Sequence, residues 1–261
     1  MPEKRSLDAL PPKLPVKVSH GAGWLAHGFH IDVHSHDEGQ LVYAASGVLA
    51  TTTERGTWVA PANRATWTPP GFGHSHRFYG LTEVHLVIIP ADVCDALVDH
   101  PAVFAVSPLL REAIIALTSR SDAGSGAYER LRAVMIDELI EAPDQSLHLP
   151  EPRDDRLRAV TDLLRADPAQ STTLAELGRR AGASARTLSR LFHVEFGMSF
   201  HRWRTILRIH HALVHLTEGQ SVTGTAMVCG WSNPASFIEA FHSVVGQTPG
   251  SYRADLPDGR K

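Results

Sequence analysis

The C-terminal part of this chain contains a duplication that sequence identity alone would not reveal. Residues from about 184 to 204 recur 49 positions later, matched in residue type although few letters are identical. The matched pairs are Ser184 and Asn233, Leu188 and Phe237, Phe192 and Phe241, Gly197 and Gly246, Ser199 and Thr248, Trp203 and Tyr252, and Arg204 and Arg253. In each copy a capping residue follows a glycine-containing turn, and apolar residues then recur at i, i+3 and i+4. This spacing predicts two copies of one small unit, each with an amphipathic helix entered from a tight turn.

A shorter helix is expected before each of these two helices. Thr173 and Glu176 have the spacing of a capping box ahead of an apolar run, which predicts that a helix begins there. The equivalent helix of the second copy begins near Ser221 and ends at a turn over residues 230–233. A longer helix over residues 200–215 is expected to join the two units. Two helix-turn-helix units on one chain are typical of a protein that binds DNA.

Four sequence motifs lie in order within this region. They are A-G-A-S-A-R-T-L-S-R-L-F at 181–192, F-G-M-S-F at 196–200, C-G-W-S-N-P-A-S-F-I-E-A-F at 229–241 and G-Q-T-P-G-S-Y-R at 246–253. A single helix-turn-helix motif would be a weak signal, but this many positions in the right order is a specific one. On these motifs, residues 154–254 resemble the DNA-binding domain of the AraC/XylS family of bacterial transcription regulators. The resemblance implies an all-α domain that binds operator DNA and acts on RNA polymerase.

The face of each second helix opposite its apolar stripe is expected to meet the DNA bases. Arg186 and Arg190 are suited to bonding guanine O6 and N7, although two arginines alone would also fit an ordinary solvated face. Glu239 can accept a hydrogen bond from cytosine N4 but repels phosphate, so we expect the second helix to discriminate weakly and to add backbone contacts from its N-terminus. The expected DNA-contacting residues are Ser184, Arg186, Thr187, Ser189, Arg190 and His193 in the first copy and Asn233, Pro234, Ala235, Ser236 and Glu239 in the second.

Charge is distributed unevenly along the chain. The formal net charge is −3 overall, but residues 154–261 hold 13 Lys and Arg against 10 Asp and Glu, whereas the rest holds 12 against 18. This division fits a DNA reader joined to an acidic domain with another task. We find no apolar leader near Met1 and no apolar run long enough to span a bilayer, so we expect a cytoplasmic protein without a membrane partner.

The N-terminal module is predicted to be rich in β-strands up to about residue 90. Short stretches separated by Gly, Pro and charged residues, as in a barrel or sandwich, lie at 40–43, 48–53, 57–60, 65–68 and 82–89. Helices are expected over 107–119 and 127–141, and Leu131, Met135 and Leu139 form an apolar stripe on the second. Such a stripe either packs on its own barrel or pairs with a second copy, and we expect a homodimer through residues 107–141.

Two histidine motifs lie in this module. The first has the pattern H-x-H-x3-Q-x6-G from His34 to Gly47, and the second has the pattern P-x-G-x2-H from Pro69 to His74. They resemble the two motifs of the cupin superfamily, small β-barrels in which histidines and an acidic residue bind a metal. The metal ligands that the resemblance implies are His34, His36, Gln40 and His74. Gln40 departs from the pattern because its neutral amide oxygen stands in the place of the acidic ligand.

Three interpretations of these histidines stay open. They could bind a divalent transition metal such as Zn, Ni, Mn or Fe, since imidazoles that converge in a closed cavity suit such ions. They could instead line a metal-free pocket for a small effector, with Tyr43, Trp67 and His76 among its walls. They could also be ordinary surface or packing residues. His76 lies two positions beyond His74 and could substitute for it as a ligand.

The expectations combine into an α+β two-domain transcription regulator. Residues 1–142 are predicted to form a cupin-like sensor and dimerisation domain, 143–155 a proline-containing linker and 156–256 the double helix-turn-helix domain. A small molecule or metal in the barrel would control DNA binding or contact with RNA polymerase. The alternative is a cupin metalloenzyme, a dioxygenase or isomerase, fused to a DNA-binding tail. Gln40 argues against an enzyme, as does the lack of an acid/base pair or nucleophile elsewhere in the sequence.

Overall fold

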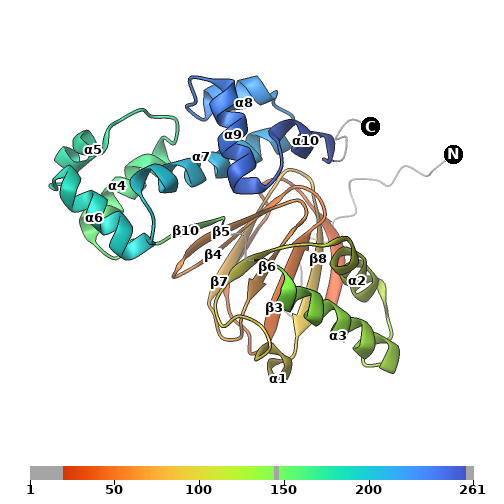
Figure 1. Cartoon of the computed structure of the whole chain (residues 1–261). Helices are drawn as coiled ribbons and strands as arrows, with labels where there is room; N and C mark the ends of the chain where they lie inside the picture. Colours follow the sequence, from red (N-terminus) through yellow and green to blue (C-terminus); the bar gives the residue numbers. More distant parts are fainter. Residues whose placement is uncertain (1–19, 144–146, 257–261) are drawn as a thin grey trace.

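The computed structural model describes residues 20–143 and 147–256, which form a strand-rich N-terminal domain and a helical C-terminal domain (Figure 1). The described strands make two antiparallel sheets that face each other. One sheet has the order β1 (His20–Leu25), β8 (Thr82–Ile89), β3 (Gly39–Ala44), β6 (Arg64–Thr68) and β9 (Ala102–Ala105). The other has the order β10 (His148–Pro150), β5 (Gly56–Pro61), β4 (Val48–Thr53), β7 (His74–Tyr79) and β2 (His30–His34). The predicted α+β fold, with a β-barrel of two facing sheets followed by an all-α C-terminal region, is confirmed.

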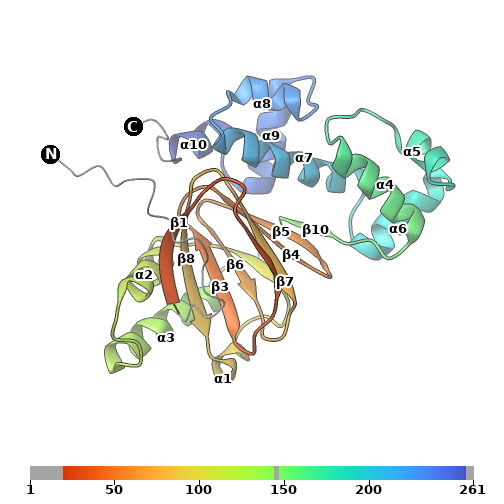
Figure 2. The same cartoon turned by 180° about the vertical axis from the view of Figure 1, so that it is seen from behind.

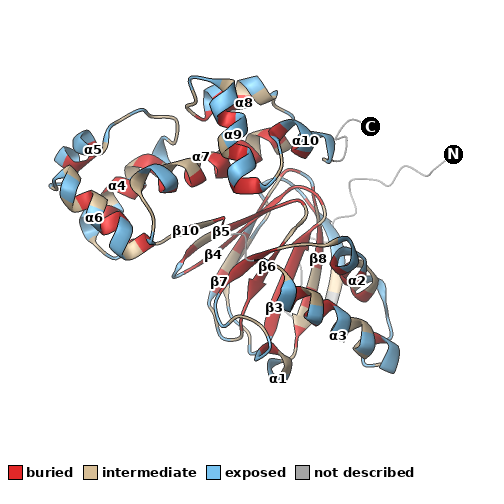
Figure 3. Ribbon diagram, in the orientation of Figure 1, coloured by how far each residue is buried: buried red, intermediate tan, exposed pale blue. Residues whose placement is uncertain are grey.

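Side chains alternate between the two faces of the strands, as the period of two requires. On β3, Val42 and Ala44 point between the sheets, where they share a core with Leu49 of β4 and Phe78 of β7. Tyr43, between them in the sequence, points to the outer face of the first sheet. The strands are therefore buried on both faces. Figure 3 shows the barrel strands largely in the colour of buried residues.

Helices cover the outer face of the first sheet. The short α1 (Ala91–Cys94) is followed by α2 (Pro108–Ser119) and α3 (Gly126–Glu141), whose N-termini are capped by the side chains of Ser107 and Ser125. Met135 and Leu139 of α3 are at most 1% exposed and pack with residues of α2 and the first sheet. The apolar stripe that the sequence placed on this helix therefore packs mainly on its own barrel.

The helical domain contains the two predicted units. Its helices are α4 (Asp155–Ala166), α5 (Leu174–Arg180), α6 (Ala185–Phe196), α7 (Phe200–Thr217), α8 (Val222–Val228), α9 (Pro234–Val245) and α10 (Pro249–Ala254). The capping box of Thr173 and Glu176 is present at the start of α5. Gly197 and Gly246, which the duplication pairs, end α6 and α9 with φ of 68° and 85°. Both positions lie in the left-handed region, where glycine has no steric penalty.

The two units differ in what they pack against. The core of the first unit is formed by α4 to α6 and the start of α7, together with Leu149 of β10. The core of the second unit continues into the barrel, because Val48 and Ala50 of β4 pack with Leu213 of α7 and Phe241 of α9. Figures 1 and 2 both show α9 and α10 beside the barrel, α8 on the side of the second unit away from it, and α5 and α6 farther off. The layers follow in this order: α2 and α3, then the two sheets, then the second unit.

The expected linker, residues 143–155, contains a strand. His148–Pro150 form β10, which pairs with β5, and the His148 ring stacks on Trp58 with ring centroids 3.9 Å apart. Pro150 lies at the end of an edge strand, where the missing N–H breaks no ladder between strands. Residues 144–146 are outside the described residues, so the domain boundaries themselves stay a prediction. None of the described helices combines the length and apolar composition needed to cross a membrane.

Candidate nucleic-acid interface and barrel site

The outward face of α6 forms a shallow concave surface. It is lined by Arg186, Thr187, Ser189, Arg190 and His193, all of them among the residues predicted to contact DNA. Ser184 caps the helix by accepting a hydrogen bond from the Thr187 N–H at 3.1 Å. The Nδ1–H of His193 donates to the Ser189 carbonyl at 2.8 Å, so the Nε2 of His193 is left for a ligand. Exposed arginines beside a capped helix N-terminus suit the major groove and its flanking phosphates.

The equivalent face of α9 has a different character. Asn233 caps the helix by accepting from the Ala235 N–H at 2.9 Å, and Pro234 takes the first helical position, as predicted. Ala235, Ser236 and Glu239 are exposed, so the structure leaves all of them accessible to DNA. Ile238, outside the predicted set, is exposed on the same face. This helix offers no cation to the groove.

The long helix α7 spans both units. Trp203 near its start is buried in the core of the first unit, and Leu213 near its end lies in that of the second. Arg208 donates to the backbone carbonyls of Pro168, Ala169 and Gln170 at 2.9 to 3.1 Å, and its guanidinium lies over the Trp231 ring. These contacts tie the loop after α4 to the turn before α9. The separation of the two recognition helices is therefore set by α7 and its packing.

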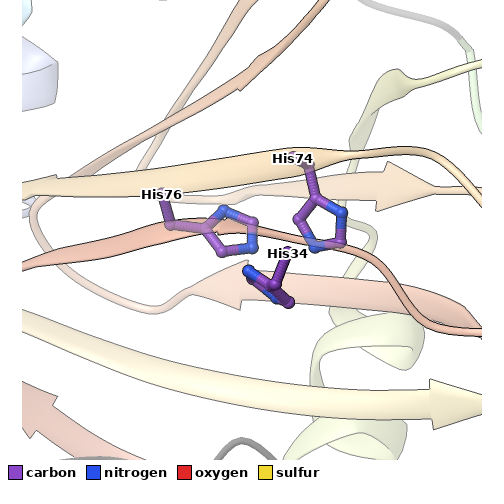
Figure 4. A group of neighbouring side chains, drawn as sticks. All are labelled: His34, His74 and His76. Atoms are coloured by element: carbon purple, nitrogen blue, oxygen red, sulfur yellow. The ribbon is translucent and has the colours of Figure 1, made fainter.

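A cluster of imidazoles lies between the two sheets at one end of the barrel. His34 at the end of β2 and His74 and His76 on β7 each offer a ring nitrogen, and these nitrogens lie within 4.8 Å of one another (Figure 4). The ladder between β2 and β7 places His34 opposite His74, and the period of two puts His76 on the same face. The His34 Nδ1–H donates to the Asp32 carbonyl at 2.9 Å, which leaves Nε2 free to bind.

Gln40 of β3 completes the cluster from the opposite sheet. Its Oε1 lies 3.0 Å from Nε2 of His74 and 2.8 Å from Nε2 of His76. Burial lowers the pKa of His74 to about 4 and the pKa of His76 well below its usual 6.5, so both rings are neutral at pH 7. The Nδ1–H of His74 donates to the Phe72 carbonyl at 2.8 Å, so the Nε2 of a neutral His74 carries a lone pair directed into the cluster.

Known proteins that are similar to this chain show which family it belongs to. A helix-turn-helix domain family matches residues 177–255. The HTH-type transcriptional regulator NimR of Escherichia coli is 32% identical over 234 residues, which cover 86% of this chain and 82% of that protein. The chain belongs to the AraC family of DNA-binding transcription regulators.

Two solved structures complete the comparison. The regulator ToxT from Vibrio cholerae covers 91% of this chain and 98% of its own, with 10% identity and a TM-score of 0.40. An AraC-type transcriptional regulator from Chromobacterium violaceum matches 40% of this chain and 94% of its own, with 23% identity and a TM-score of 0.38.

Within this AraC-family chain, the four predicted metal ligands do not form one group. His34, Gln40 and His74 come together, but His76 takes the place that the motif assigned to His36. The ring of His36 lies 5.1 Å from that of His74, and its Nε2 is shielded from solvent without a hydrogen-bond partner among the described residues. The strand β2 ends at His34, so His36 lies just beyond it, but its ring still turns to the same side, with its centroid 5.9 Å from that of His34.

The two aromatic residues predicted to line an effector pocket point elsewhere. Tyr43 and Trp67 are at most 1% exposed and belong to the core beneath α2 and α3. The pairing of β3 with β6 places Leu41 opposite Trp67 and Gln40 opposite Thr68, which puts Trp67 on the face away from Gln40. The expectation was wrong, because β3 and β6 have a second core on their other side, beneath α2 and α3. His76, the third predicted effector residue, does lie in the cluster.

Two threonines near the cluster were not among the predicted site residues. The Thr51 hydroxyl of β4 lies 3.0 Å from Nδ1 of His76. Thr68, which β3 pairing places opposite Gln40, is 1% exposed, and its hydroxyl has no hydrogen-bond partner among the described residues. The sequence could have indicated both threonines, because alternate residues of a strand point to the same face. Thr51 therefore shares the inward face with Leu49, and Thr68 shares it with Thr66.

Proposed function

We propose that this AraC-family regulator is a one-component sensor whose barrel binds a divalent transition metal as its effector. The observation that carries the proposal is the convergence of ring nitrogens of His34, His74 and His76 within 4.8 Å of one another between the two sheets. Three imidazole nitrogens suit Zn, Ni, Mn or Fe, with the softer nitrogen-preferring ions favoured. Because burial already keeps His74 and His76 neutral, a metal would not have to displace protons from them at pH 7.

Gln40 supports a sensing role over a catalytic one. It supplies a neutral oxygen within 3.0 Å of two of the ligand nitrogens, so the group would bind a cation with no anionic partner. A site of neutral ligands binds more weakly than one with a carboxylate, which suits reversible occupation. We therefore propose that the protein is not an enzyme.

Strand β4 supports a route from the site to the DNA reader. Thr51 of β4 points inward and contacts His76, whereas Val48 and Ala50 point outward into the core shared with α7 and α9. On the same side of the barrel, Arg64 donates to the Val245 carbonyl at the end of α9 at 2.8 Å. A shift of His76 on ligand binding would therefore reach the second unit through one strand.

The remaining partners follow from the family and from exposed surface. We propose that the regulator acts in the cytoplasm on operator DNA and RNA polymerase, and that it does so as a homodimer. The homodimer would form through residues 107–141, where Leu109, Val134 and Ile140 stay exposed after the rest of the apolar stripe is buried. Pairing would also double the number of readers on a tandem operator.

The proposal is tested by metal binding with a matched pair of histidine variants. Full-length protein without an affinity tag is dialysed against Zn or Ni, and bound metal and the thermal midpoint are measured. His34→Ala should abolish binding and the metal-induced rise in midpoint, whereas His36→Ala should keep both within about twofold, because His36 lies outside the three-histidine group. Operator affinity should change with metal in the parent and in His36→Ala only. Absence of stoichiometric metal in the parent would eliminate the metal and leave an organic effector.

A further inference from the structure

We infer that the second recognition helix reads pyrimidines, with Ile238 contacting a thymine methyl group and Glu239 accepting from a cytosine amino group. The operator would then pair a box read through guanine by α6 with a box read through thymine and cytosine by α9. This inference rests on the DNA-binding function of the family and is independent of the metal proposed for the barrel.

The duplication aligns the residues of α9 with those of α6. The residues that line the concave face of α6 are Arg186, Thr187, Ser189, Arg190 and His193. Their counterparts 49 positions later are Ala235, Ser236, Ile238, Glu239 and His242, and all of these are exposed. The two helices have the same length, each begins after a capping side chain, and each ends at a left-handed glycine, so equivalent positions point in equivalent directions. Ile238 and Glu239 therefore stand where Ser189 and Arg190 stand on α6.

The charges of the two units exclude a shared mode of reading. The first unit carries Arg179, Arg180, Arg186 and Arg190 between residues 174 and 196, whereas residues 222–245 contain no Lys or Arg and one acidic residue, Glu239. Guanine presents only acceptors in the major groove, and neither Ile238 nor Glu239 carries a donor that could bond them. A carboxylate beside those acceptors would be repelled, so Glu239 selects against guanine.

The chemistry that remains on α9 fits pyrimidines. The thymine C5 methyl is the only apolar group in the major groove, and cytosine N4 presents a donor that a carboxylate can accept. Ile238 is 39% exposed, whereas Phe237 and Phe241 of the same helix are fully buried. Ala235, one turn earlier, is small enough to let the helix approach the groove. Asn233 caps the N-terminus of α9 by accepting from the Ala235 N–H, and the positive end of the helix dipole there would favour a flanking phosphate although α9 has no Lys or Arg.

The test begins with selection of binding sites from random duplex DNA by the full-length protein, with and without added Ni or Zn. Two boxes about one helical turn apart are expected, one with guanine and one with thymine beside cytosine. Arg190→Ala is the matched control and should relax the guanine box alone. A second box with guanine, or with no base preference, would overturn the inference while leaving DNA binding intact. Failure to enrich any sequence would instead contradict the DNA-binding function itself.

Two substitutions then separate the roles of Ile238 and Glu239. Glu239→Gln should change the preferred base from cytosine to adenine, because a glutamine amide bonds adenine N6 and N7. Replacing the contacted thymine by uracil removes only the methyl group and should weaken binding by the parent about fourfold, on the scale of one buried methylene. Ile238→Ala should bind both duplexes equally, with its guanine box unchanged as evidence of folding. A parent protein that binds the uracil and thymine duplexes equally would overturn the role of Ile238, and this arm needs no variant to fold.

Discussion

At the scale of single residues, Gln40 is the side chain of the facing sheet that meets two of the clustered imidazoles. It is 5% exposed, it reaches two imidazoles from the facing sheet, and it is the one group near their ring nitrogens that could be made anionic without lengthening the side chain. Neutral His74 and His76 present lone pairs or weak donors there, so the charge at position 40 decides how well a cation is held.

Substituting Gln40 by Glu should therefore raise metal affinity. The carboxylate replaces a neutral oxygen by an anionic one at the same reach, so the rise in thermal midpoint on adding Zn or Ni should be larger for Gln40→Glu than for the parent. Gln40→Leu, which keeps the bulk and removes the oxygen, should give a smaller rise. The comparison is between midpoints with and without metal for each protein. Equal midpoints with and without metal in all three would contradict a metal site.

At the scale of elements, the two units keep the same helix ends although their surfaces diverge. Gly197 and Gly246 both close a second helix in the left-handed region, with their N–H groups bonded to His193 and His242. A residue with a Cβ is strained at such a φ whatever space surrounds it. The duplicated glycines thus keep the turn after each recognition helix the same.

Gly197→Ala should consequently lower the free energy of unfolding of the helical domain by about 1 kcal/mol. No atom lies within 4 Å of the added Cβ, so the loss would come from the backbone alone. Gly250→Ala is the control, because Gly250 is helical with no positive φ and its new Cβ would approach only Thr248 Oγ1, at 4.0 Å. Urea unfolding followed by helical circular dichroism measures both. A Gly197→Ala protein as stable as the control would show that the left-handed end carries no cost.

At the scale of the whole molecule, the sensor and the second reader share one core. Val48, Ala50 and Ala62 of the barrel pack with Leu213 and Tyr252 of the helical domain. Among the residues that the structure describes, the core of the first reader includes Leu149 of β10 as its buried residue from the barrel sheets, and the first reader is joined to the rest through α7. A change in the barrel is thus expected to act on the second reader first, and through α7 on the spacing of the pair.

Dimerisation involves the whole molecule, and it can be tested by changing exposed residues of α3. Ile140 is 53% exposed, so Ile140→Glu should leave the fold intact and convert a dimer to monomers at micromolar concentration. Val33→Glu, at a position 77% exposed on β2, is the matched control and should leave assembly unchanged. Leu139→Glu is unsuitable because Leu139 is 1% exposed and the change would disrupt the barrel core. Sedimentation of Ile140→Glu as a dimer would place the interface elsewhere.

The sequence by itself determined the elements whose signals are local. Capping residues, glycine ends and apolar spacing act within one or two turns, so Thr173, Asn233 and the recognition faces could be assigned before any tertiary contact was known. The convergence of His34, Gln40 and His74 was also predictable, because the histidine motifs imply where each of these residues stands on its strand.

Only the tertiary structure decided which side of each strand meets which layer. An alternating strand has two faces, and the sequence of β3 does not say that Tyr43 faces α2 and α3 while Gln40 faces the histidines. The same ambiguity applies to β7, where only the pairing with β2 shows that His76 joins His34 and His74 in the cluster. The strand β10 within the expected linker and the core shared by β4 with α9 likewise depend on partners far away in the chain. Such contacts form because the packed whole buries apolar surface, a quantity that no local stretch of sequence specifies.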